Sequence, residues 1–263
     1  MNIFFRELKA NRKALIIWSI CIFLYVLAGM SKYTAYSSGA NSDVFSKMPA
    51  TMRALLGIGS FDVTKLSGFF AFLFPYVAII TAIHAALIGS GIIAKEERDK
   101  TTEFLMVKPV SRTTVITSKL LAALFNILVV NIVTLISSIV FAEVYNKGKS
   151  INHEIIMFLL SMFIMQLIFM SIGAFLATYM KNAKSSGSMA AIIVIVSYVI
   201  SKITDVTDKV NGLNILSPFK YFDYQDIVNG GNINFLIALL SLLIVLVFSA
   251  SAYYFYLRRD LKV

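Results

Sequence analysis

The chain has 263 residues, of which 58% are hydrophobic and only 14% carry a charge. Soluble domains contain about 25% charged residues, so this composition excludes an ordinary soluble domain and favours an integral membrane protein. The formal net charge of +10 fits charged membrane flanks that attract anionic lipid, and it does not indicate nucleic acid, since no basic soluble domain is present. The single cysteine, Cys21, excludes an intramolecular disulfide and a thiolate metal site.

Six long stretches without Asp, Glu, Lys or Arg predict an all-α membrane protein with six transmembrane helices in a single domain, residues 1–263. A helix that crosses a bilayer needs about 17–25 apolar residues and satisfies its own backbone groups. A barrel strand would instead alternate apolar and polar residues, and these runs do not. The predicted spans are residues 14–31, 67–94, 119–142, 155–180, 185–202 and 232–257.

Three segments outside the spans have patterns of their own. Residues 1–13 mix apolar residues with four Lys or Arg, which predicts a short amphipathic helix on the membrane surface; the alternative is a plain anchoring flank. Residues from Pro49 to Leu56 predict a short surface helix between the first two spans. Residues 202–232 combine aromatic, Asp and Lys residues, which is typical of an interfacial or partly re-entrant segment.

The distribution of basic residues predicts the orientation. If the N-terminus is cytoplasmic, the inner segments contain 15 of the 24 Lys and Arg residues, although they are shorter in total than the outer segments. Cytoplasmic segments are enriched in Lys and Arg. We therefore expect both termini and the segment between the second and third spans to be cytoplasmic.

A few polar side chains lie within the predicted spans. His84 is either a functional intramembrane group or, as we favour, a neutral side chain hydrogen-bonded to a neighbouring helix. Asn131 shares a helix face with Thr134 and Ser138, whereas Gln166 is isolated in the sequence. We interpret these groups as a polar interior that joins helices, rather than as ligands.

The residues do not form a catalytic set. No Gly-x-x-x-x-Gly-Lys-Ser/Thr phosphate loop is present, so we expect the chain to bind no nucleotide itself. The pair Glu96-Glu97 has no His at membrane depth near it and no Arg at the spacing of membrane-embedded prenyl-protein proteases. Neither a nucleophile–base pair nor a metal site can be assembled, so the sequence predicts no enzyme activity for the chain alone.

The charged segment 96–112, between the second and third spans, contains a short apolar run. Phe104 and Leu105 lie between charged residues, which predicts a helix of about two turns over residues 101–108. Pro109 then ends any helix. Such a short helix needs a packing partner.

Three interpretations of this helix stay open on pattern alone. Its apolar face could rest on the chain's own helices, or enter a groove on a separate cytoplasmic protein. The third alternative is an ordinary charged loop that satisfies the orientation rule. Thr101 or Thr102 is suited to cap the helix, and Glu103 places a negative charge near its N-terminus.

This segment resembles the one between the second and third spans of ABC-2-type permeases. That family shows Ala-x-Glu-Glu, then Thr-x-Glu-x-Leu, then Pro-Val-Ser-Arg, then Lys-Leu at the start of the next span. The matching residues are Ala94, Glu96, Glu97, Thr101, Glu103, Leu105, Pro109, Val110, Ser111, Arg112, Lys119 and Leu120. The runs at 6–18 and 216–222 are also similar to the family, so the resemblance covers essentially the whole chain. Lys100 departs from it, because many members have glycine there.

The resemblance implies a role and partners. Family members form the membrane half of an ATP-binding-cassette exporter, in which two permeases, identical or homologous, pair above two ATPase subunits in a bacterial plasma membrane. ATP and Mg would be bound by the ATPase, and this chain would hold no cofactor. Residues 101–108 would be the coupling helix, which fits a cleft in the ATPase.

The resemblance also implies the residues of the docking site. They are Glu96, Glu97, Thr101, Glu103, Phe104, Leu105, Lys108, Pro109 and Arg112. The three glutamates would be polar contacts, and Arg112 would hold the return path to the third span.

The substrate is less constrained. The spans contain almost no fixed charge, which favours an amphipathic or hydrophobic substrate over an ion. We favour peptides such as toxins or antimicrobial peptides; drug, lipid or ion export are alternatives within the family. A membrane sensor or scaffold that transports nothing is the alternative of another class.

Overall fold

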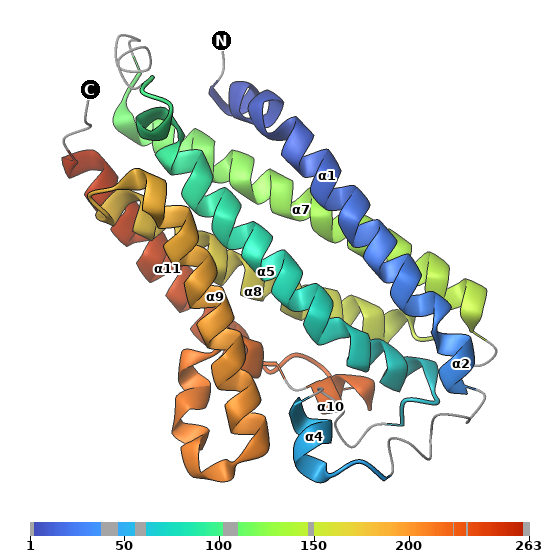
Figure 1. The fold of residues 1–263 in the computed structure, drawn as a ribbon. Helices are drawn as coiled ribbons and strands as arrows, with labels where there is room; N and C mark the ends of the chain where they lie inside the picture. The colour runs from blue at the N-terminus through green and yellow to red at the C-terminus, as the bar shows by residue number, and fades with distance from the viewer. Residues whose placement is uncertain are drawn as a thin grey trace.

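The structure is a computed structural model that describes residues 3–37, 47–55, 62–101, 110–146, 150–222, 224–229 and 231–259. These residues form helices and connections, with no strand among them (Figure 1). The elements are α1 (Ile3–Ser31), α2 (Tyr33–Ser37), α4 (Ala50–Leu55), α5 (Leu66–Arg98), α7 (Arg112–Tyr145), α8 (Asn152–Tyr179), α9 (Ala183–Val206), the 3-10 helices η1 (Asp208–Leu216) and η2 (Pro218–Lys220), α10 (Tyr224–Val228) and α11 (Phe235–Arg258).

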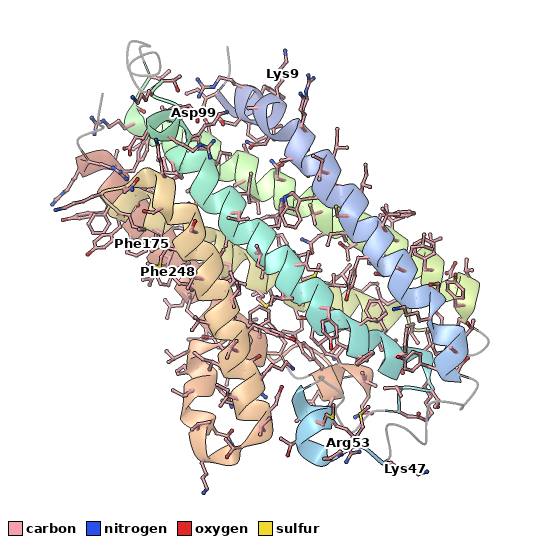
Figure 2. All side chains as sticks on the ribbon, in the orientation of Figure 1. Lys9, Lys47, Arg53, Asp99, Phe175 and Phe248 are labelled. Atoms are coloured by element: carbon pink, nitrogen blue, oxygen red, sulfur yellow. The ribbon has the colours of Figure 1, made fainter. Side chains whose placement is uncertain are left out.

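Six of these helices are long and apolar enough to cross a membrane, as the sequence predicts. They are α1 with its extension α2, α5, α7, α8, α9 and α11. Both ends of the described chain lie at one end of the bundle, which we call the terminal end (Figure 1). Lys9 and Asp99 lie at this end, and Lys47 and Arg53 lie at the other (Figure 2).

Two helices, α1 and α7, begin well before the predicted spans, because the first uncharged residue is not what starts a helix. The separate surface helix over residues 1–13 is wrong: α1 runs without a break from Ile3 to Ser31. It contains no Pro, its one glycine is Gly29 near its end, and its Arg6 and Glu7 side chains form ion pairs with α5. α7 begins at Arg112 rather than at residue 119, because the Ser111 side chain accepts a hydrogen bond from the Thr114 amide and caps the helix.

The centre of the bundle is a close crossing of α5 and α8. Gly89 faces the carbonyl oxygen of Met170, and Gly173 faces that of Ala86, so closely that a Cβ atom at either glycine would lie 2.2 or 2.3 Å from the oxygen. Small residues permit this approach between membrane helices. α5 is the most buried of the six spans and α11 the least, so the others surround the α5–α8 pair.

At the other end, the segment after α9 packs back onto the bundle. Phe219 is buried and contacts Phe169 of α8, with ring centroids 5.5 Å apart. Tyr224 lies against Phe74 and Phe158, and burial raises its pKa above the usual value. The predicted interfacial segment is therefore partly buried by protein. α4 occupies residues 50–55 of the predicted surface helix.

Candidate functional site at the terminal end

A cluster of charged side chains joins α1, α5 and α7 at the terminal end. Glu96, in the last turns of α5, is only 8% exposed. Its Oε1 accepts a hydrogen bond from Arg6 Nη2 at 2.9 Å, and its Oε2 forms an ion pair with Lys119. Lys119 is fully buried, and its ammonium also donates to the carbonyl oxygen of Ile92. We call Arg6, Glu7, Lys95, Glu96 and Lys119 the Glu96 cluster.

Glu7 completes the Glu96 cluster on the side of α1. It is fully buried, although it lies only about one turn from the start of the helix. Arg6 Nη2 lies 2.7 Å from Glu7 Oε1, and Lys95 Nζ lies 3.5 Å from Glu7 Oε2. Arg6 therefore binds both carboxylates of the cluster. Burial of a charge is costly unless it is paired in this way.

A second set of contacts joins α5, α7, α8 and α11. Arg259, directly after α11, places Nη2 2.7 Å from Glu97 Oε2 and donates through Nη1 to the carbonyl oxygens of Ala177 and Thr178. Arg112, the first residue of α7, donates to the carbonyl oxygens of Leu257 at 3.1 Å and Arg259 at 2.8 Å. These carbonyls belong to helix ends and have no partner within their own helix.

Two of the polar groups within the spans, His84 and Gln166, have surroundings that the sequence did not show. His84 is buried and packs on the Trp18 ring, with centroids 5.0 Å apart. Its Nδ1 has no hydrogen-bond partner among the described residues, so the expected bond to a neighbouring helix is wrong for this atom. Gln166 is not isolated, because its Oε1 accepts a hydrogen bond from Asn131 Nδ2 and so joins α8 to α7.

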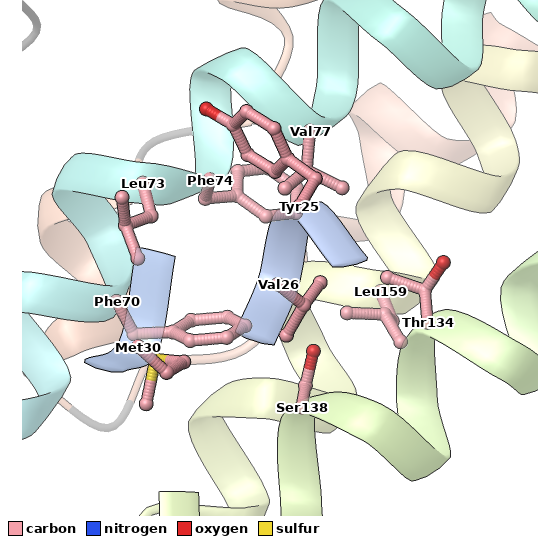
Figure 3. Close-up of a pocket in the computed structure, with 10 residues that line it drawn as sticks. All are labelled: Tyr25, Val26, Met30, Phe70, Leu73, Phe74, Val77, Thr134, Ser138 and Leu159. Carbon is pink, nitrogen blue, oxygen red and sulfur yellow. The ribbon is translucent and has the colours of Figure 1, made fainter. Parts of the chain in front are cut away.

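A small cavity lies between α1, α5, α7 and α8 (Figure 3). Its lining is mostly apolar, with Thr134 and Ser138 contributing hydroxyl groups. Thr134 donates to the carbonyl oxygen of Val130, whereas the Ser138 hydroxyl has no partner among the described residues. An apolar lining with one unpaired hydroxyl offers neither a nucleophile–base pair nor a charged ligand.

A family model described as "ABC-2 family transporter protein" matches residues 1–261. The chain belongs to this ABC-2 transporter family. No curated protein matches it. Membership makes the chain a multi-pass membrane permease of an ABC transporter, and it implies an ABC ATPase as a partner in general.

The coupling helix expected in this permease falls largely outside the described residues. Residues 102–109, which include Glu103, Phe104, Leu105, Lys108 and Pro109, are not described. The structure does describe both approaches to them. At the end of α5, the Thr101 amide donates to the carbonyl oxygen of Glu96 at 2.8 Å.

Lys100, which departs from the glycine of the resembled family, has a backbone conformation that favours glycine. Its φ is 55°, in the left-handed region, and it ends α5 between the amides of Asp99 and Thr101, which donate back to the last turn. Glycine is preferred at this position after a helix, because a Cβ atom there is strained. In this chain a lysine adopts that conformation.

The structure gives Glu96 and Glu97 partners within the permease. The resemblance implies that both contact an ATPase, but Glu96 is buried in its cluster and Glu97 binds Arg259. Their described role is to join α5 to its neighbours. Arg112 holds the start of α7, by binding the end of α11.

The partners of these groups were missed by the sequence analysis. They are Arg6, Glu7, Lys119 and Arg259. One signal was available, because Lys119 opens a predicted span, and an ionisable group at such a position is expected to have a partner in the protein.

The contact between Asn131 and Gln166 gives a testable expectation for the permease. Replacement of either residue by leucine should lower the free energy of unfolding by about 1 kcal/mol, because each change leaves the other amide without its interhelical partner. The double variant should cost less than the sum of the single variants, since both polar groups are then removed. Unfolding in detergent micelles would measure the three values, and strictly additive losses would contradict the contact.

Proposed function

We propose that this permease exports an amphipathic or hydrophobic substrate, favoured as a peptide such as a toxin or antimicrobial peptide, with ATP hydrolysed by a separate ATPase. One observation carries the proposal. The helices on either side of residues 102–109 are α5 and α7, and ion pairs hold them to each other and to their neighbours: Glu96 with Lys119, and Glu97 with Arg259. A displacement of that segment would therefore move α1, α8 and α11 along with α5 and α7. A loop without a mechanical role has no need of such links.

In this proposal the terminal end is cytoplasmic and the segment 102–109 is the coupling helix. Phe104 and Leu105 enter a groove on the ATPase, and the charged residues around them form a polar rim. Two ATPase subunits, which bind ATP and Mg, act on two permeases, identical or homologous. Closure of the ATPases displaces the coupling helices, and the ion pairs carry that movement into the spans.

The polar groups of the spans support the kind of substrate. Asp, Glu, Lys and Arg are confined to the ends of the long helices, and the groups farther inside are amides, hydroxyls and one imidazole. An ion site within the membrane would need fixed charges or clustered ligands. Amides and hydroxyls together with apolar surface suit a peptide better, since it presents its own donors and acceptors.

A charged double substitution tests the docking segment. Phe104→Asp with Leu105→Asp should reduce co-purification of the ATPase by more than about tenfold, because two carboxylates would have to enter an apolar groove. The permease should still insert and fold, since both residues lie outside the spans. The measurement is the yield of ATPase recovered with the tagged permease in mild detergent.

The matched control makes the same change of charge at the other end of the bundle. Ile215 and Leu216 are adjacent and exposed, at 64% and 61%. Ile215→Asp with Leu216→Asp should recover the ATPase at the wild-type yield. Equal recovery with both double variants would show that the segment 102–109 does not dock the ATPase.

The experiment that tests the proposal as a whole is purification of the wild-type permease from its native membrane, followed by mass spectrometry. A stoichiometric partner with a phosphate loop supports ATP-driven transport, and a peptide bound to the same complex supports the substrate class. Recovery without any ATPase would favour the sensor or scaffold instead. A complex that carries a lipid or drug would overturn the peptide and keep the transporter.

A further inference from the structure

The two ends of the segment between α5 and α7 meet on one residue after α11. Glu97, in the last turn of α5, binds the Arg259 side chain, with Oε2 2.7 Å from Nη2. Arg112, the first residue of α7, binds the backbone of the same residue, with Nη1 2.8 Å from the Arg259 carbonyl oxygen. The side chain of Arg259 therefore holds the segment where it begins, and its backbone holds the segment where it ends.

Arg259 is itself anchored to the core of the bundle. Its Nη1 donates to the carbonyl oxygens of Ala177 and Thr178, at the end of α8. α8 is the helix that crosses α5 most closely, so this contact ties Arg259 to the rigid centre. The planar guanidinium suits this task, because its donors point in fixed directions and reach a carboxylate and two carbonyls at once.

The pair formed by Arg259 and Glu97 is sheltered from water. The side chains are 14% and 12% exposed, so salt and solvent screen their interaction less than on an open surface. The neighbouring Arg258 differs from Arg259 in its exposure and in its contacts. It is exposed, and its guanidinium lies over the ring of Tyr254 in its own helix, 4.1 Å from the ring centroid.

We propose that Arg259 is a positioning residue that fixes the spacing between the two ends of the docking segment, so that an ATPase meets the segment in one arrangement. This inference rests on the proposed function of the segment. It adds that the C-terminal end of α11, which lies far from residues 102–109 in the sequence, decides how well the ATPase docks.

The test compares Arg259→Gln with Arg258→Gln as a matched control. In the permease alone, in lipid nanodiscs, amide hydrogen exchange of residues 95–101 and 110–115 should be at least about tenfold faster in Arg259→Gln than in wild type. The control should exchange at the wild-type rate. Glu97→Gln should also accelerate exchange, although it leaves the contacts of Arg259 with α8 in place.

The second measurement is the affinity of the purified ATPase for the folded permease. We expect Arg259→Gln and Glu97→Gln to weaken it by about tenfold, with little further loss in the double variant, because both changes remove the same link. Arg259→Lys keeps the charge and serves if Arg259→Gln fails to fold. It should weaken binding less than Arg259→Gln, since an ammonium cannot reach all the partners.

Two outcomes would overturn the inference. If Glu97→Gln leaves exchange and ATPase affinity unchanged, Arg259 only stabilises the end of α8. If exchange rises while the folded permease binds the ATPase with wild-type affinity, the role is structural and not positioning. Failure of the proposed function would look different, because the wild-type chain would then bind no ATPase. Faster exchange in Arg259→Gln and Glu97→Gln would still show that Arg259 holds the two ends of the segment.

Discussion

Gly89→Ala is expected to leave almost no folded permease. A Cβ atom at this position would lie 2.2 Å from the backbone carbonyl oxygen of Met170, and no side-chain rotation can separate them, because the position of a Cβ atom is fixed by its own backbone. α5 and α8 would have to move apart by about 1 Å, which would open the contacts along the centre of the bundle. We expect a loss of about 3 kcal/mol or more, at the upper end of the cost of overpacking.

Gly91 provides the control, because it lies in the same helix and a Cβ atom there would have nothing within 4 Å. Gly91→Ala should fold as wild type does, and it removes the general effect of a glycine replacement in a helix. Size-exclusion chromatography after detergent extraction would measure the folded, monodisperse fraction of each variant. Equal fractions for the two variants would show that α5 and α8 are not in close contact at this point.

The six spans could be predicted because one physical requirement dominates them. Charged residues are excluded from the interior of a bilayer, so uncharged runs mark the spans without any knowledge of how the helices pack. The ends of the helices follow other rules. α7 begins at the Ser111 cap, ahead of Lys119, because helix ends depend on hydrogen bonds to the backbone rather than on hydrophobicity.

The contacts of the site could not be predicted in the same way. Arg6 and Glu96 are 90 positions apart, and Glu97 and Arg259 are 162 positions apart, so each pair depends on which helices become neighbours. The residue types were visible, and a buried charge requires a partner, but the sequence does not say which one. The same limit applies to Gln166, whose partner is on another helix.

Lys119→Met is expected to destabilise the permease strongly through the Glu96 cluster. Lys119 is fully buried, and it pairs with Glu96, which is 8% exposed. Removal of one partner leaves a buried carboxylate that Arg6 alone must balance. The expected loss is about 3 kcal/mol, at the lower end of the cost of breaking a buried ion pair, because the contact between Arg6 and Glu96 remains. Thermal unfolding in lipid nanodiscs would measure it.

Two further variants separate the ion pair from other effects of the substitution. Lys95→Met removes another cation of the Glu96 cluster. The Lys95 side chain is 29% exposed and its Nζ lies 3.5 Å from Glu7 Oε2, so this variant should lose less than about 1 kcal/mol of stability. Lys119→Met combined with Glu96→Gln should recover part of the stability, because the unpaired charge is then removed as well. If the double variant is less stable than Lys119→Met alone, Lys119 acts through its packing and its bond to the Ile92 carbonyl, and the pair with Glu96 contributes little.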